Sequence, residues 1–219
     1  MIKNQLVRGL KSWGQVSAMY EKIAYIILGV AIGKLFDFYI QRRKVSSLEV
    51  AILEELEDIK YRLLLICRSY ERSIQIYALN GIDSGVPLKL SNPIFKKHYS
   101  DIAIKLGSAQ RKSLSLIDSC VESVNLGINR IEELHSNTVA NLSDEAIERW
   151  GDLLKAQYIN AATAYWHVNY HLSNQELPFL DIEDSEEHKA YLSQRKSSEE
   201  HVEKLIKRAR ESLNRDDFD

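Results

Sequence analysis

Two charged side chains interrupt the most apolar stretch of this 219-residue sequence. Lys34 and Asp37 lie within IAYIILGVAIGKLFDFYI, residues 23–40, and Gln41 follows directly. Ionisable groups are costly inside a lipid bilayer, where they usually face a helix bundle or a water-filled path. The pattern therefore predicts ion-path chemistry, with Lys34, Asp37 and Gln41 as candidate pore-lining groups. A simple intrahelical pair between Lys34 and Asp37, three residues apart, is the alternative.

Two glycines precede these charges at a spacing that allows close helix packing. Gly29 and Gly33 are one helical turn apart, and a Gly-x-x-x-Gly row lets two backbones approach each other in a membrane. At 100° per residue this row shares one sector of about 140° with the three polar groups just named. The sequence thus predicts that several copies of the helix pack around this face, with Gly29 and Gly33 as helix contacts. The motif alone also occurs by chance in apolar helices.

Two basic clusters suggest binding to anionic groups. Arg42, Arg43 and Lys44 follow the apolar run at once, where they would contact anionic lipid headgroups. The second cluster lies near the C-terminus and is interleaved with glutamates. It is either a solvated face with salt bridges or a site for a phosphate-rich regulatory ligand. Its members are Lys204, Lys207, Arg208 and Arg210.

The remaining reactive side chains form no catalytic pattern. His167 and His171 have the i, i+4 spacing that can place two imidazoles on one metal ion, but no third ligand is evident, which favours ring packing between helices. There is no nucleophile motif, no phosphate-binding glycine loop and no Cys-x-x-Cys pair. Cys67 and Cys120 have apolar neighbours, as buried reduced thiols do. We therefore predict no catalytic residue, no metal site, no cofactor and no enzymatic activity.

The apolar run has about the length of a membrane span. Eighteen helical residues extend about 27 Å, close to the roughly 30 Å of a bilayer's hydrocarbon core. Its ten strongly apolar residues favour insertion by roughly 3 to 6 kcal/mol, and each charge opposes it by about 2.5 to 3.5 kcal/mol at mid-bilayer. Alone, the helix is a marginal span. We predict a transmembrane helix over 23–41; a buried helix of a soluble bundle and an interfacial helix are the alternatives.

Apolar residues recur at three- and four-residue steps through most of the chain that follows. This periodicity predicts long amphipathic helices over 47–79, 109–136 and 144–172. No strong breaker lies between residues 41 and 46, so the first of these can continue from the apolar run. A shorter helix is expected over 93–106, where Pro93 occupies a first-turn position. These helices would form one bundle.

Composition and capping residues support an all-helical chain. Three prolines and nine glycines accompany 45% hydrophobic and 27% charged residues, as in an ordinary folded protein. Asn92 and Ser143 stand where N-caps are expected. The net charge of −2 provides no global field that would attract nucleic acid or anionic lipid. The final segment is highly charged with a narrow apolar face, which predicts a peripheral helix or helix pair.

The predicted fold class is all-α and homo-oligomeric: an N-terminal amphipathic helix and a single transmembrane helix, followed by a cytosolic bundle of long helices. The reduced thiols and the tight Arg-Arg-Lys cluster favour a cytosolic C-terminal domain. The expected parts are an amphipathic segment over 1–22, the transmembrane helix over 23–41, the helical bundle over 42–182 and a charged helical segment over 183–219.

The arrangement of residues 23–44, together with NPIFKKHYSDIAIKLG around residues 93–107, resembles the membrane effectors of bacterial anti-phage systems. The nearest comparison is the Hailong-type channel effector. The resemblance implies a homo-oligomer in the bacterial inner membrane, single-pass, whose gated ion path depolarises an infected cell in abortive infection. It also implies a nucleotidyltransferase partner whose oligonucleotide holds the cytosolic domain shut. The alternatives are a non-conducting membrane-tethered sensor or scaffold that binds a protein partner, and a soluble helical interaction protein.

Overall fold

A computed structural model describes the backbone of most of the chain, except residues 1, 141–142, 175–184 and 219. The described residues are 2–140, 143–174 and 185–218, and side chains are described from residue 25 onward. Within these ranges, only the backbone is described for residues 2–24, 137–140 and 187. The predicted amphipathic face of segment 1–22 therefore lies outside the described residues.

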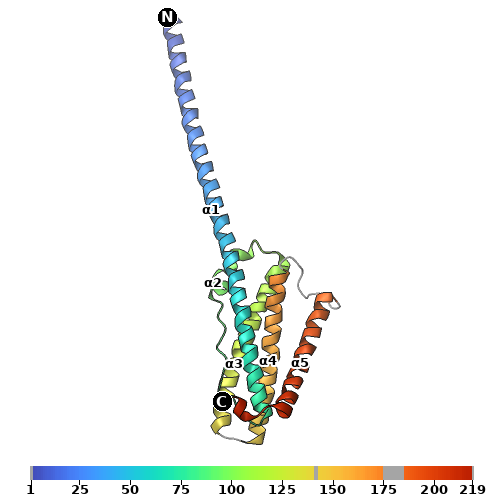
Figure 1. Ribbon diagram of the computed structural model, residues 1–219. Coiled ribbons are helices and arrows are strands. Elements are labelled where there is room, and N and C mark those ends of the chain that lie inside the picture. Colours follow the sequence, from blue (N-terminus) through green and yellow to red (C-terminus); the bar gives the residue numbers. More distant parts are fainter. Residues whose placement is uncertain (1, 141–142, 175–184, 219) are drawn as a thin grey trace. The chain divides into compact units, whose positions relative to one another are not determined.

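Every regular element among the described residues is a helix, which confirms the all-α class (Figure 1). Two compact units divide the chain, Met1–Glu49 and Val50–Asp219. The elements are α1 (Ile2–Ala78), α2 (Pro93–Ala103), α3 (Ser108–Ala140), α4 (Asp144–Ser173), α5 (Glu186–Ser212) and the 3-10 helix η1 (Arg215–Phe218).

The apolar stripe predicted over 47–79 is the part of α1 that belongs to the second unit's core. It continues the preceding helix without a break, as the absence of proline and of paired glycines between residues 41 and 46 allows. One buried residue per turn faces the other helices, the spacing of a core-facing helix. The buried members of the stripe are Ile52, Leu56, Ile59, Leu63, Ile66, Tyr70 and Ile74.

Helices α3, α4 and α5 complete this core. Helix α3 packs along α4, and α4 packs along α5. Two glycines permit close approach: a Cβ atom at Gly151 of α4 would overlap the ring of Tyr77 on α1, and one at Gly127 of α3 would overlap the side chain of Gln157 on α4. The buried stripe of α3 comprises Leu114, Ile117, Val121, Val124, Ile128 and Ile131, as its periodicity predicts.

Helix α2 is capped by a residue of another helix. Both carboxylate oxygens of Glu55 on α1 accept hydrogen bonds from α2, from the Ile94 N–H at 2.9 Å and the Phe95 N–H at 2.7 Å. The prediction that Asn92 caps α2 is wrong, because its side chain makes no cap bond and instead donates to Asp118 of α3 at 2.7 Å. Free N–H groups at a helix start donate to any well-placed oxygen, so a buried carboxylate serves as well as a capping side chain.

The other predicted cap, Ser143, is confirmed. Its hydroxyl accepts from the N–H of Ala146 at 3.2 Å at the start of α4.

The loop between α1 and α2 is attached to α3. The N–H of Leu90 donates to the Asn125 side chain at 2.7 Å, and the Asn125 amide donates to the Leu90 carbonyl at 3.0 Å. These two bonds fix the loop on α3 at Leu90.

The charged C-terminal segment forms one long helix whose second half is buried on the bundle. Polar contacts attach it to α1: the His201 ring lies 2.9 Å from the Glu71 carboxylate, and Arg72 donates to the backbone carbonyl of Phe218 at 2.6 Å. A hydrogen bond from the Tyr158 hydroxyl of α4 to Glu71, at 3.3 Å, joins the same cluster. The buried face of α5 comprises Ser198, Val202, Leu205, Ile206 and Ala209.

Candidate functional site: the apolar segment of α1

The candidate site is the stretch of α1 between residues 25 and 40, here called the apolar segment. Every residue in it is exposed, and its large apolar side chains are between 50% and 72% accessible. A helix that is hydrophobic all round is normally buried in a protein core or in lipid. The exposed apolar side chains are Tyr25, Ile26, Ile27, Leu28, Val30, Ile32, Leu35, Phe36, Phe38, Tyr39 and Ile40.

The predicted packing and pore-lining residues are exposed on the surface of α1. A Cβ atom added at Gly29 or Gly33 would have no neighbour within 4 Å among the described residues, so no described helix covers the glycine row. Lys34, Asp37 and Gln41 are exposed. Within the described residues no ion pair of 4.0 Å or less joins Lys34 to Asp37, so the intrahelical alternative is not formed. Helix geometry alone brings these five residues onto one sector.

The basic cluster lies next to aromatic rings. Arg42, Arg43 and Lys44 are exposed at the end of the apolar segment. Arg43 and Lys44 line a shallow hollow together with apolar and aromatic side chains of the preceding turns. Aromatic rings beside basic side chains are typical of helices at a membrane–water boundary. The other residues of the hollow are Phe36, Tyr39, Ile40 and Ser47.

The single-pass transmembrane helix predicted over 23–41 requires a correction. Among the residues whose side chains are described, no helix is both long enough and apolar enough to cross a membrane. The segment from 25 to 40 extends about 24 Å against a hydrocarbon core of about 30 Å, and it includes both Lys34 and Asp37. Residues 23 and 24, which begin the predicted span, lie outside that described part.

The C-terminal cations lie on the solvent side of α5 among acids. Lys204, Lys207 and Arg208 share one sector of the helix, but Glu211 lies in the same sector and pairs with Lys207 at 3.9 Å. Arg210 is exposed on another side of α5, so the structure does not gather the four predicted ligand-binding cations into one site. The geometry fits the solvated, salt-bridged interpretation better than a phosphate site.

The paired histidines are packed among rings and helices. His167 is buried against Tyr191 and Trp166, with ring centroids 5.4 Å and 5.0 Å away, and burial lowers its pKa to about 4. Burial also lowers the pKa of His171, whose Nδ1 lies 2.8 Å from the Ser113 hydroxyl. No group of three or more metal-binding side chains occurs in the part of the chain that the structure describes.

The two thiols have the properties of unreactive core groups. Cys67 is buried and Cys120 is half-buried, and neither forms a disulfide. Burial is the largest cause of their raised pKa values, about 12 for Cys67 and about 11 for Cys120. A protonated thiol is a poor nucleophile and a poor metal ligand at neutral pH.

Sequence reasoning missed two buried carboxylates that organise the bundle. Glu55 caps α2, and Asp83 accepts a hydrogen bond from the Ser73 hydroxyl at 2.7 Å and from the Gly85 N–H at 3.0 Å. A signal was present for Glu55, which stands between Ile52 and Leu56 on the buried stripe. A charged residue in such a stripe indicates a partner, although the partner itself cannot be read from periodicity.

Fold and site together define an all-helical protein in which long helices form a bundle and one helix has an exposed apolar segment. No family model, no curated protein and no solved structure matches the chain.

Proposed function

We propose that the protein is a membrane-associated homo-oligomer in which the apolar segments of several copies form a gated ion path, controlled through the helical bundle. The observation that supports this is the exposure of the apolar segment on all sides, since the described residues leave at least half of each large side chain accessible. In water such a surface is unstable, because each exposed apolar side chain forgoes about 1.5 to 3 kcal/mol of burial. Lipid and sister copies together would cover it.

Oligomerisation addresses the charges of the segment. A lone helix would expose Lys34 and Asp37 to lipid, at about 2.5 to 3.5 kcal/mol each near the bilayer centre. Association along the Gly29 and Gly33 row would turn this sector inward, where charges usually line a water-filled path. Self-association and ion conduction would then depend on the same face, and membrane attachment on the opposite one. The anti-phage setting and the oligonucleotide control implied by the resemblance remain predictions.

Membrane attachment is tested by floating the full chain with phospholipid vesicles and washing them with alkaline carbonate. Leu35→Lys places a charge on the lipid-facing side of the segment and should shift the chain to the soluble fraction by about 100-fold, corresponding to roughly 3 kcal/mol. Leu126→Lys is the matched control, since Leu126 is a similarly exposed leucine on α3. Equal flotation of both variants would remove the membrane from the proposal.

Conduction is tested with a voltage-sensitive dye in bacteria that express the chain, before and after phage infection. Wild type should depolarise the membrane, and Asp37→Leu should abolish or strongly reduce the signal while flotation is retained. Glu148→Leu, at an exposed position of α4, is the control and should behave as wild type. If wild type and Asp37→Leu leave the potential equally unchanged while both float, the ion path is wrong.

A non-conducting tether is the second candidate, and the exposed apolar segment favours it equally. It requires a lipid-anchored helix but no polar interior face, so any unrelated membrane helix should replace residues 23–40 without loss of function. The two candidates are distinguished by the same dye measurement, because only the first depends on Lys34, Asp37 and Gln41.

A further inference from the structure

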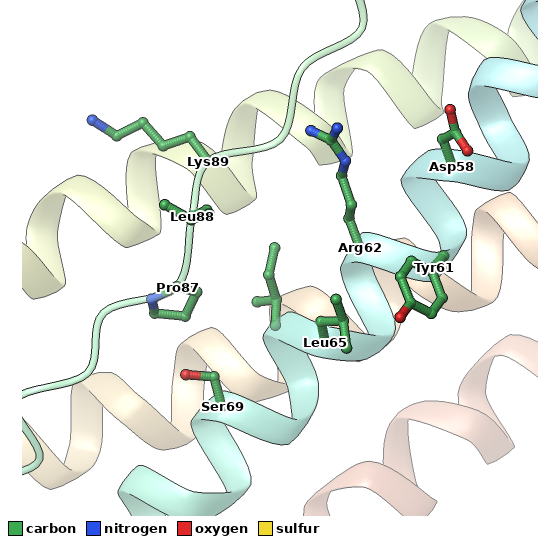
Figure 2. A pocket seen from close by; sticks show the side chains of 9 residues that line it. Asp58, Tyr61, Arg62, Leu65, Ser69, Pro87, Leu88 and Lys89 are labelled. Atoms are coloured by element: carbon green, nitrogen blue, oxygen red, sulfur yellow. The ribbon is translucent and has the colours of Figure 1, made fainter.

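A second surface with ligand-site properties lies on the bundle, between α1 and the loop that follows it. It is a groove of about 620 Å³, within the range of about 300 to 1,000 Å³ that small-molecule sites occupy. Figure 2 shows α1 on one side of the groove and the loop on the other. Its apolar lining comprises Tyr61, Leu65 and Ile66 of α1 and Pro87 and Leu88 of the loop.

The apolar wall of the groove is unusually open to solvent. Leu88 is 89% accessible and Tyr61 is 61% accessible, although both belong to a unit with a well-buried core. The loop is not free to collapse onto α1, because Asn125 bonds both the N–H and the carbonyl of Leu90 two residues further on. The groove is therefore held open by the fold, and its apolar wall is available to a ligand.

One cation in the groove, Arg62, has no ion-pair partner among the residues that the structure describes. Arg62 extends from α1 beside the loop (Figure 2), and within the described residues it forms no ion pair of 4.0 Å or less. Lys89 extends away from α1 and lies 3.7 Å from Glu132 of α3. The Asp58 carboxylate also lines the groove and opposes a second negative charge on a ligand. The lining thus favours one negative charge and disfavours a polyphosphate.

We infer that this groove binds a single-chain amphiphile with one carboxylate, whose apolar chain lies against Leu65, Ile66 and Leu88 and whose head pairs with Arg62. A guanidinium presents two parallel N–H donors that match a carboxylate. The hydroxyl of Ser69, which also lines the groove, is available as a further donor. This site is separate from the apolar segment and does not depend on the ion path.

The test uses the full chain in phosphatidylcholine nanodiscs with photoreactive dodecanoate, and mass spectrometry maps the labelled positions. Labels on residues 58–69 and 85–90 report the groove, whereas labels on 25–40 report general contact with lipid chains. Arg62→Gln should lower groove labelling about tenfold, the value of one charge-assisted hydrogen bond, and leave labelling of 25–40 unchanged. Arg149→Gln, an exposed arginine on α4, is the matched control and should label as wild type.

Two further comparisons decide the ligand chemistry. The double variant Leu65→Ser, Leu88→Ser should lose groove labelling, whereas Leu126→Ser, Leu192→Ser, at exposed leucines elsewhere, should not. Photoreactive dodecanol and dodecylamine should label the groove at least about tenfold less than dodecanoate, because neither pairs with a guanidinium. Equal labelling by all three probes, absence of label, or a crosslink to a second copy would each overturn the inference. Labelling of 25–40 reports separately on the proposed membrane contact.

Discussion

Helix α1 contains two apolar stretches that differ in where their partners lie. Between residues 50 and 78 most apolar residues form one stripe that is buried in the bundle, whereas Val50, Tyr61 and Leu65 lie off the stripe and are exposed. Between residues 25 and 40 the apolar residues surround the helix, and all are exposed. An apolar stripe is buried by packing against one neighbouring face, whereas a helix that is apolar all round needs neighbours on every side to bury its side chains. The comparison indicates that the first stretch contributes to the core, whereas the described residues leave the second stretch uncovered.

The largest expected effect is a difference in unfolding free energy between two leucine-to-alanine variants, one in each stretch of α1. Leu63 is 0% accessible and Leu35 is 68% accessible. Leu63→Ala should lower the free energy of unfolding by about 2 to 5 kcal/mol, through lost burial and a cavity. Leu35→Ala should change it by no more than about 0.5 kcal/mol. Urea unfolding followed by circular dichroism measures both, and equal losses would contradict the comparison.

The buried imidazole of His167 should make the unfolding free energy of the bundle depend on pH. The folded pKa of His167 is about 4 against 6.5 when unfolded, so its contribution is fully present above pH 6.5. As the pH falls toward 4 the unfolded chain binds a proton that the fold excludes, and stability decreases by about 3 kcal/mol. His171 acts in the same direction. His167→Gln should therefore flatten the pH dependence of the unfolding free energy.

The pH dependence of unfolding is measured for wild type, for His167→Gln and for a control at a surface histidine. The difference in unfolding free energy between pH 7 and pH 4.5 should be smaller for His167→Gln than for wild type. His98→Gln is the control, because that ring lies in a surface pair 3.2 Å from Asp101. An unchanged pH dependence in His167→Gln, with a changed one in His98→Gln, would show that the relevant ring is at the surface.

Helix positions and the core stripes could be predicted from sequence because they depend on local periodicity. The stripes of α1 and α3, the start of α2 at Pro93 and the Ser143 cap all follow from residues within a few positions of each other. Long-range partners could not be predicted in this way. The Glu55 cap joins residues 39 and 40 positions apart, and the groove depends on how the loop lies beside α1.

The candidate site was only partly accessible to sequence reasoning for a different reason. Hydropathy identified the apolar segment and the row from Gly29 to Gln41, and the structure adds that nothing in the described chain covers them. The C-terminal cations differ, because they are close in sequence but α5 presents Arg210 on another side from Lys204, Lys207 and Arg208.

Substitutions of Glu55 test how much the carboxylate on α1 stabilises the start of α2. Glu55→Ala leaves two backbone N–H groups of α2 without an acceptor and should cost about 1 to 3 kcal/mol of stability. Glu55→Gln keeps one acceptor oxygen and should cost less. Glu57→Ala, at an exposed position two residues further on, is the control. Amide exchange of both Ile94 and Phe95 should accelerate in Glu55→Ala, that of only one of them in Glu55→Gln, and neither in Glu57→Ala.

The smallest expected effect is that of glycine-to-alanine changes at Gly151 in the bundle and Gly33 in the apolar segment. A methyl group at Gly151 would overlap the Tyr77 ring, whereas a methyl group at Gly33 would meet nothing within 4 Å. Gly151→Ala should destabilise the bundle by about 1 to 2 kcal/mol, because overpacking exceeds the roughly 1 kcal/mol gained in helix propensity. Gly33→Ala should not destabilise the chain, because it gains the same helix propensity without a clash, yet it should weaken self-association in detergent, measured by sedimentation. Unaltered association in Gly33→Ala would show that sister copies do not meet along that row.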